Sequence, residues 1–362
     1  MEPSGISGRD WPNLGKPLAD RFGVGQWFHY QDYLAVEMAV ELLAELGLQH
    51  LRTGISWADF FRPDGPAWYD WMMSRLRQAR LELLVSVWHT PPSISEGDCC
   101  SSPPRRLQDY ADFIDTLITR YRDSLGTVEL WNEPNNRLKW NFTRFDPDWK
   151  KFGAMIGMAG YWAKERDCAT ALGGMMPVDR HWLRLMRDYG VLDQIDVVAI
   201  HGFPGMWEGD EYWWDWPEHW RGWAEKVETI TRGSDGHPVW VTETGFATWD
   251  LELQRPGQFE EQCAMLQQAI AINAERVYWY SLIDLDPTRA AIEMTEDGGR
   301  IDHREYHLGL VTYDGRRKPA FDLLRQLGRA DQPADLRPHL PLSLGRIRKG
   351  AKIVSTRSSP DF

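Results

Sequence analysis

The sequence predicts a (β/α)8 barrel in a single domain. Eight short runs rich in β-branched and aromatic residues recur along the 362 residues, and longer helical patterns fill the intervals between them. Successive runs begin 26 to 44 residues apart, which suits repeated βα units of about thirty residues. Helices that alternate with apolar strands favour parallel pairing with both sheet faces covered, and eight such units close into a barrel.

The elements follow from local patterns. The predicted strands are 21–27, 50–57, 83–89, 127–131, 170–174, 196–201, 239–242 and 276–281. Helical patterns occupy 35–47, 109–121, 146–165, 259–272 and 319–328. Gly47 is expected to end the first helix, and Asp146 with Pro147 to begin the third. A doubly wound open sheet is the alternative, but no Gly-x-Gly-x-x-Gly motif follows the first strand.

The barrel is predicted to span residues 21–328. Residues 1–20 are interpreted as an N-terminal loop segment that closes the bottom of the barrel. Residues 329–362 contain four prolines, little periodicity and a basic patch, so they are interpreted as a C-terminal extension, either a strap on the barrel wall or a partly disordered tail.

Composition excludes several classes of protein. With 41 Lys and Arg against 53 Asp and Glu, the net charge of −12 is unsuited to nucleic acid or to an anionic membrane. No apolar run approaches the ~18 residues that span a bilayer, and the N-terminus lacks the apolar stretch of a secretory signal. Four cysteines without metal-ligand spacing predict a reduced, cytoplasmic protein with no metal and no cofactor. The oligomeric state cannot be predicted from the sequence.

Polar and aromatic residues gather where the predicted strands end, which in a (β/α)8 barrel is where active sites form. The candidates at these strand ends are Arg52, Trp57, Trp88, His89, Asn132, Glu133, His201, Glu243, Trp279 and Tyr280. The strand interiors are otherwise mostly Val, Leu, Ile and Ala. This asymmetry predicts a site at the carboxyl ends of the strands.

Two carboxylates stand out, Glu133 after the fourth strand and Glu243 after the seventh. Cleavage of an acetal with retention needs one carboxylic acid to protonate the leaving oxygen and one carboxylate to attack the anomeric carbon, ~5–5.5 Å apart. The acid must keep its proton near neutral pH, whereas the nucleophile must stay ionised, and Arg52 could supply the charge that favours ionisation. Each motif alone is compatible with a helix start or a strand-ending turn, but their joint position on strands four and seven favours catalysis.

The motifs Trp131–Pro134 (Trp-Asn-Glu-Pro) and Thr242–Gly245 (Thr-Glu-Thr-Gly), with the eight-unit rhythm, resemble glycoside hydrolase clan A. This superfamily of cellulases, mannanases and β-xylosidases has its acid/base on strand four and its nucleophile on strand seven. The resemblance covers about residues 20–328, including the closing stretches 307–311 and 318–321. It implies a polysaccharide or glycoside substrate and a carbohydrate-metabolising hydrolase of O-glycosyl bonds.

The resemblance also implies roles around the sugar that is cleaved. Asn132 would bind the sugar 2-hydroxyl, and Arg52 would orient the nucleophile. His89 and His201 would line the −1 subsite, and Trp279 would form its floor, with Tyr280 as the alternative because the register is uncertain by one residue.

One position departs from the family pattern. Many cellulase-like members carry His-x-Tyr on strand six, and this chain has His201, Gly202 and Phe203 instead. Either Tyr280 or Tyr30 supplies the missing hydroxyl, or the nucleophile relies on Arg52 and a histidine. The departure favours the β-xylosidase-like members over the endo-cellulases.

Tryptophan is abundant, with 20 residues in the chain. Indole faces pack on the apolar faces of sugar rings, so Trp57 and Trp88 are candidate subsite residues, as are Trp207 and Trp213 in the loop after the sixth strand. The sequence as a whole predicts a retaining β-glycosidase. The alternatives are a non-catalytic barrel that binds glycans and a transglycosylase with the same site.

Overall fold

The structure, a computed structural model, describes residues 16–206, 222–288 and 302–330. Its centre is a closed barrel of parallel strands in the order β1-β10-β7-β6-β5-β4-β3-β2. The predicted (β/α)8 barrel is therefore confirmed. The open-sheet alternative is wrong, because β1 pairs in parallel with both β2 and β10 and so leaves no edge.

Every predicted strand is present, with bounds within two residues of those expected. The barrel strands are β1 (Phe22–Gly25), β2 (His50–Ser56), β3 (Glu82–Trp88), β4 (Thr127–Leu130), β5 (Ala169–Met175), β6 (Val197–His201), β7 (Val239–Thr244) and β10 (Arg276–Tyr280). A two-stranded antiparallel sheet, β8 (Trp249–Asp250) with β9 (Arg255–Pro256), lies in the connection after β7.

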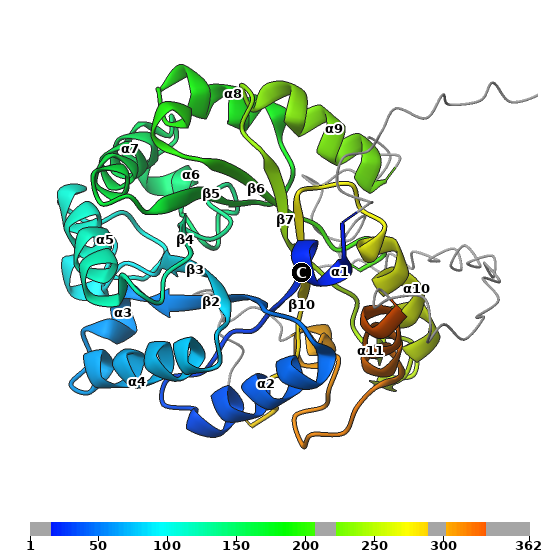
Figure 1. Cartoon of the computed structure of the whole chain (residues 1–362). Coiled ribbons are helices and arrows are strands. Elements are labelled where there is room, and N and C mark those ends of the chain that lie inside the picture. The colour runs from blue at the N-terminus through cyan, green and yellow to red at the C-terminus, as the bar shows by residue number, and fades with distance from the viewer. Residues whose placement is uncertain (1–15, 207–221, 289–301, 331–362) are drawn as a thin grey trace, which may run out of the picture.

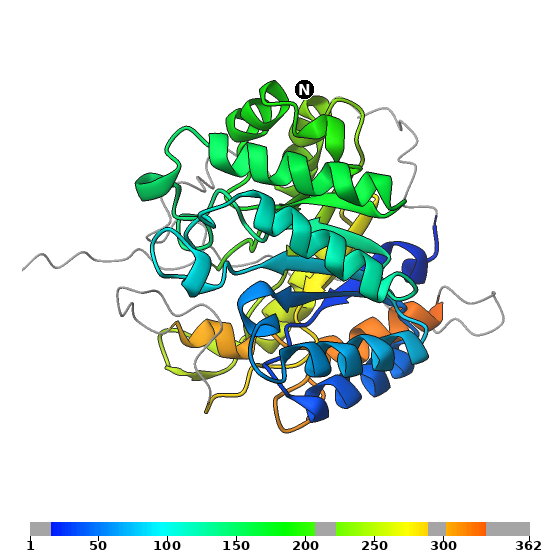
Figure 2. The same ribbon diagram turned by 90° about the vertical axis from the view of Figure 1, so that its left-hand side faces the viewer.

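Helices form a ring around the barrel, which Figure 1 shows end-on and Figure 2 from the side. The helices of the ring are α2 (Tyr33–Leu46), α4 (Gly65–Gln78), α5 (Gln108–Tyr121), α7 (Lys150–Glu165), α8 (Arg180–Asp188), α9 (Trp223–Gly233), α10 (Phe259–Ile270) and α11 (Pro319–Ala330). Shorter turns are α1 (Leu18–Arg21), α3 (Trp57–Phe60), α6 (Phe142–Phe145), η1 (Pro92–Ile94), η2 (Leu192–Gln194) and η4 (His303–His307). None of the helices within the described ranges is long and apolar enough to cross a bilayer.

Helix α2 illustrates how local chemistry fixes the ring. The Asp32 carboxylate accepts a hydrogen bond from the backbone N–H of Ala35 at 3.1 Å and so caps the first turn. At the other end Gly47 has a φ of 69°, and its N–H donates to the Ala44 carbonyl at 3.2 Å. The predicted glycine C-cap is thus confirmed.

Two local expectations differ from the structure. Helix α7 begins at Lys150 and not at Asp146, whose carboxylate instead accepts hydrogen bonds from the N–H groups of Lys151 and Phe152, both at 2.9 Å. Residues 18–20, expected in a loop, belong to the turn α1, which lies over the amino-terminal end of the barrel in Figure 1. The predicted N-terminal loop segment before residue 16 and the predicted extension beyond residue 330 are not tested, because these residues lie outside the described ranges.

The side chains inside the barrel change from apolar to polar along the barrel axis. An apolar layer contains Leu84, Ala171, Val197, Trp240 and Tyr278, contributed by different strands. The next inward position after Trp240 on β7 is the polar Thr242, because inward side chains alternate along a strand. The polar groups of the site therefore stand on a packed apolar floor inside the barrel.

Candidate active site

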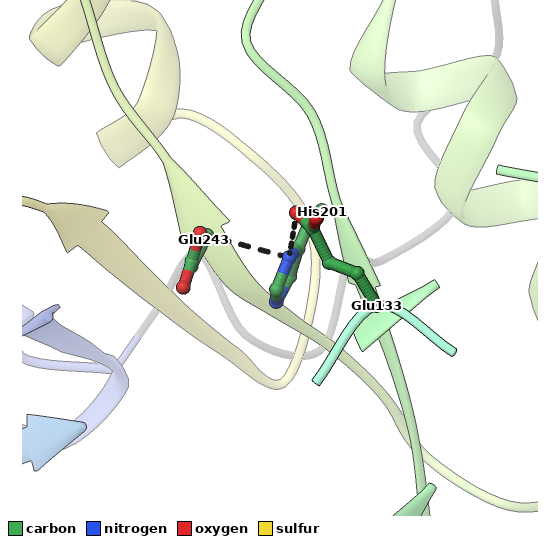
Figure 3. Close-up of side chains that lie close together, drawn as sticks. All are labelled: Glu133, His201 and Glu243. Atoms are coloured by element: carbon green, nitrogen blue, oxygen red, sulfur yellow. Dashed lines mark hydrogen bonds and ion pairs between the residues drawn. The ribbon is translucent and has the colours of Figure 1, made fainter. Parts of the chain in front are cut away.

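Glu133 and Glu243 converge at the carboxyl end of the barrel. Glu133 follows β4, Glu243 lies near the end of β7, and the two side chains are 6% and 5% exposed. His201, at the end of β6, lies between them, as Figure 3 shows, with its Nδ1 3.0 Å from Glu133 Oε1 and 3.7 Å from Glu243 Oε2. One oxygen from each glutamate and the His201 nitrogen all lie within 4.8 Å of one another. The two carboxyl groups are therefore close enough to act on one sugar, and their nearest oxygens are near the ~5–5.5 Å spacing typical of a retaining pair.

Arg52 connects the Glu243 side of this pair to the barrel interior. Its Nη1 donates a hydrogen bond to Glu243 Oε1, and its Nη2 donates to Asn132 Oδ1 at 2.8 Å. Complete burial opposes the charged guanidinium, but Glu129 and Glu243 outweigh burial and raise the pKa of Arg52. Arg52 is therefore a permanent cation that favours the ionised form of Glu243.

Sequence reasoning missed Glu129, which is fully buried on β4. Its Oε2 accepts from Arg52 Nε at 2.9 Å and from Arg52 Nη2 at 2.5 Å. Its Oε1 accepts from the Thr242 hydroxyl at 2.9 Å. The available signal was a single charged residue in the strand Thr127–Leu130, two positions before the end of the predicted strand.

The turn that carries Asn132 and Glu133 has an unusual backbone. Trp131 and Glu133 have φ values of 76° and 43°, in the left-handed region that costs free energy for residues with a Cβ atom. Tyr110 of α5 holds this turn, because its hydroxyl accepts from the Trp131 N–H at 3.1 Å and donates to the Val87 carbonyl at 2.7 Å. Asn136 Nδ2 donates to Glu133 Oε2 at 3.0 Å and fixes the carboxyl itself.

Two glycines make room for rings in the site. A Cβ atom at Gly174 would lie 1.9 Å from His201 Nε2, so only glycine allows the imidazole its present position. A Cβ atom at Gly54 would lie 1.6 Å from the Trp27 ring. Trp27 is a second residue that sequence reasoning missed. It is half-buried after β1, and the Arg52 guanidinium lies 5.2 Å from its ring centroid.

His89 and Trp88 lie beside Trp27 at the end of β3. The Trp88 ring meets Trp27 edge to face at 5.9 Å, and its centroid lies 3.5 Å from that of His89. Burial, assisted by the nearby Lys139 ammonium, lowers the pKa of His89 to about 3. His89 is therefore neutral at physiological pH and can only donate or accept hydrogen bonds there.

On β10 the structure favours Tyr280 over Trp279. Cβ atoms built at Gly23 and Gly25 would lie 2.8 Å from the Tyr278 ring and 3.2 Å from the Tyr280 ring, so both tyrosines share the inward face. Trp279 faces the opposite way and is completely buried. Its expected role as the subsite floor is wrong, because the register differs by one residue.

The other aromatic predictions have mixed outcomes. Trp57 is buried against the α5 side chains of Tyr110 and Phe113, so its expected role in a subsite is wrong. Tyr30 lies against Arg62, whose guanidinium is 4.1 Å from its ring centroid, and not against Glu243 among the described contacts. Trp207 and Trp213 lie outside the described residues.

The trio Glu133, His201 and Glu243 is also the group of described residues that could together approach a metal ion. Two oxygens and one nitrogen match the ligands of zinc. However, the Arg52 guanidinium already pairs with Glu243, and a second cation beside it would be repelled. The trio is better suited to exchanging protons than to holding a metal.

Asp284 and Asp286, which follow β10, accept hydrogen bonds from residues of the surrounding loops. Asp286 Oδ1 accepts from the N–H and hydroxyl of Thr288 at 2.9 and 2.7 Å. Asp284 Oδ1 accepts from Lys318 Nζ and from the Gly309 N–H, both at 2.7 Å, at the wall of a cavity of about 640 Å³ between the loops after β7 and β10. Burial raises the pKa of Asp284 to about 6 despite the attraction of Lys318.

Replacing Lys318 with methionine is expected to destabilise the fold by ~3–5 kcal/mol near pH 8, because it leaves the buried Asp284 carboxylate unpaired. At pH 5 the loss should be much smaller, because Asp284 has a raised pKa and is protonated there, so the penalty is present above that pKa and absent below it. Denaturant unfolding at the two pH values measures the difference. The double variant Lys318→Met with Asp284→Asn should recover most of the loss at pH 8; equal destabilisation at both pH values would contradict this account.

Comparison with known proteins adds to this geometry. Residues 28–158 match the model of glycosyl hydrolase family 1. Among solved structures, a family 39 β-xylosidase from Caulobacter crescentus is 16% identical with a TM-score of 0.61, over 88% of this chain and 74% of that chain. A family 30 endoxylanase from Clostridium papyrosolvens C71 is 16% identical with a TM-score of 0.55, over 88% and 74%. The chain resembles the clan A retaining glycosidases.

A further structural relative is a family 39 glycoside hydrolase from the gut symbiont Bacteroides cellulosilyticus WH2. It is 17% identical with a TM-score of 0.58, over 88% of this chain. This chain spans only 64% of that relative's length. No curated protein sequence matches the chain. The family model matches only part of the chain, and identities this low to the solved structures show a shared fold but neither a shared activity nor a shared substrate.

Proposed function

We propose that the protein is a retaining β-glycosidase that works by double displacement through a covalent glycosyl-enzyme intermediate. The observation that carries this proposal is the pair of buried glutamates whose nearest oxygens, together with His201 Nδ1, lie within 4.8 Å of one another. Each glutamate has a different partner: Arg52 pairs with Glu243, and His201 contacts Glu133 at the shorter of its two distances. Two carboxyl groups keep different protonation states only when their surroundings differ, and the different partners provide that difference.

In the first step Glu243 attacks the anomeric carbon while Glu133 gives its proton to the leaving oxygen. Arg52 keeps Glu243 ionised and fixes one of its oxygens. The buried cluster then contains one cation, Arg52, and two carboxylates, Glu129 and Glu243. This excess of negative charge opposes the ionisation of Glu133, which therefore keeps its proton until the leaving group takes it.

In the second step water attacks the glycosyl-enzyme and Glu133 accepts a proton from it. Esterification has by then removed the charge of Glu243, so Arg52 is balanced by Glu129 alone. The ionised form of Glu133 is less opposed in this state, and the same residue can act as a base. The change of role thus follows from a change of charge in the cluster.

The proposed substrate is a β-linked glycoside, with β-xylosides as the first candidates. The departure at Phe203 and the resemblance to proteins described as a β-xylosidase and an endoxylanase support this choice. Asn132 is proposed to bind the 2-hydroxyl, and Trp27, Trp88, His89 and Tyr280 to contact the sugar in or beside the −1 subsite. Asn132 suits its role because Arg52 Nη2 donates to its oxygen and so turns its amide N–H groups away from Arg52.

The test is turnover of a panel of nitrophenyl β-glycosides, with the first-formed product followed by NMR. A β-anomer formed first supports double displacement, and an α-anomer formed first would contradict it. Binding of oligosaccharides without any turnover would replace the proposal with a glycan-binding barrel. Transfer to an added sugar in preference to water would make the protein a transglycosylase.

Arg52→Lys is expected to lower kcat/KM on the order of 10²-fold, because charge-assisted hydrogen bonds to a buried carboxylate are worth ~1.5–3 kcal/mol. The guanidinium donates to Glu129, Glu243 and Asn132 at once, and a single ammonium cannot reproduce that fork. Steady-state kinetics on the best substrate of the panel measure the loss. As a matched control, Arg62→Lys changes an exposed arginine and should leave kcat/KM unchanged. Equal activity of both variants would remove Arg52 from the mechanism.

A further inference from the structure

Glu129 is joined to the general acid by a continuous chain of hydrogen bonds. Glu129 Oε1 lies 2.9 Å from Thr242 Oγ1, which lies 3.0 Å from His201 Nε2. The other ring nitrogen, His201 Nδ1, lies 3.0 Å from Glu133 Oε1. Glu129, Thr242 and His201 are completely buried, so bulk water does not interrupt this part of the hydrogen-bond chain. The four residues come from β4, β7, β6 and the turn after β4.

The direction of each hydrogen bond follows from the chemistry of its end. Glu129 contacts the guanidinium of Arg52, which is always charged, so Glu129 is a carboxylate that can only accept. The single hydroxyl proton of Thr242 is therefore donated to Glu129. Thr242 Oγ1 can then only accept from His201, so Nε2 must carry a proton. In the neutral imidazole this leaves Nδ1 as an acceptor that faces Glu133.

We propose that Glu129 is a positioning residue that sets the tautomer of His201 and thereby holds the acid proton on Glu133. A lone pair at Nδ1 stabilises the protonated carboxyl, which can donate to it, and disfavours the carboxylate, which cannot. The same Glu129 fixes the guanidinium of Arg52 that pairs with Glu243. One buried carboxylate thus organises both members of the catalytic pair. This inference rests on the proposed function only in assigning Glu133 as the acid.

Two further charged groups, Glu243 and Arg52, lie near Glu133 and His201. Glu133 is faced by His201 from β6 and Glu243 from β7, and Arg52 from β2 stands behind Glu243. His201 lies between the same two glutamates. Glu243 pairs with Arg52 through Oε1, and its Oε2 lies 3.7 Å from His201 Nδ1, farther than Glu133 Oε1 at 3.0 Å. Glu133 on one side and Thr242, which is bonded to Glu129, on the other therefore make the shorter contacts with the His201 ring.

Glu129→Gln reverses the relay. Arg52 Nε and Nη2 both donate to one oxygen of Glu129, so the amide oxygen of glutamine should take that position and its NH2 group should face Thr242. The Thr242 hydroxyl must then donate to His201 Nε2, which moves the imidazole proton to Nδ1. An Nδ1–H group stabilises the Glu133 carboxylate instead of the acid.

The first readout is the tautomer of His201 by ¹⁵N NMR, with its signals assigned by their loss in His201→Asn. The expected result is an Nε2–H imidazole in the native chain and an Nδ1–H imidazole in Glu129→Gln. The second readout is the basic limb of the pH profile of kcat/KM, which should move to lower pH by about one unit when one hydrogen bond is reversed.

A second pair of variants tests the relay without touching Glu129 or its contact with Arg52. Thr242→Val removes the hydroxyl, so Nε2 loses its acceptor and the proton should move to Nδ1 as in Glu129→Gln. Thr242→Ser keeps the hydroxyl and should keep both the native tautomer and the native pH profile. An Nε2–H imidazole in both Glu129→Gln and Thr242→Val would overturn the inference. Because NMR needs no substrate, a chain that proves inactive on every glycoside would refute the proposed function and leave this test intact.

Discussion

Glu243→Ala is expected to reduce turnover of an aryl β-glycoside by a factor of at least about 10⁴, because the variant lacks the nucleophile of the first step. The folded barrel should survive, since Glu243 is at the end of β7 and contacts other site residues. Initial rates of nitrophenol release measure the effect. Glu252→Ala, an exposed glutamate after the same strand, is the matched control and should retain native rates.

Azide distinguishes a missing nucleophile from a damaged site. In Glu243→Ala the space left by the carboxylate admits azide, which should attack the anomeric carbon from the same face and give the inverted α-glycosyl azide. Glu133 is still present to protonate the leaving group in that reaction. A β-glycosyl azide, or no rescue with an activated substrate, would assign the nucleophile to another residue.

Glu133→Ala is expected to affect substrates according to their leaving groups. Glycosides with poor leaving groups should be hydrolysed ~10²–10⁴-fold more slowly, which is the usual contribution of a positioned general acid. Dinitrophenyl glycosides, whose leaving groups need no proton, should lose far less in the glycosylation step. The comparison is a plot of log(kcat/KM) against leaving-group pKa for the native and variant chains. Parallel lines of equal slope would show that Glu133 does not act as the acid.

The fold could be predicted because it depends on patterns that extend over many residues. Eight apolar runs separated by helical patterns leave few alternatives, and each strand is found within two residues of its expected bounds. Glu133 and Glu243 could be recognised as candidates for the same reason. Both come at the end of a strand, and the ends of parallel strands meet at one face of a barrel.

The direction in which single side chains point could not be predicted. Whether Trp279 or Tyr280 faces inward depends on a register difference of one residue, which the short run 276–281 does not fix. The sequence places Glu129 two residues before the Trp131–Pro134 motif but does not show which side chains it contacts. Its importance arises from Arg52 and Thr242, which are 77 and 113 residues away along the chain. The prediction that Trp57 contacts the sugar is wrong because a residue just beyond a strand can also begin a helix, and α3 begins at Trp57.

The contact between Gly174 and the ring of His201 gives position 174 a diagnostic value. Related chains that keep both glutamates but carry alanine or a larger residue there cannot keep the imidazole where it is here, and they must control their acid by another arrangement. A residue without a side chain would thus sort such enzymes into two groups, although it takes part in no reaction itself.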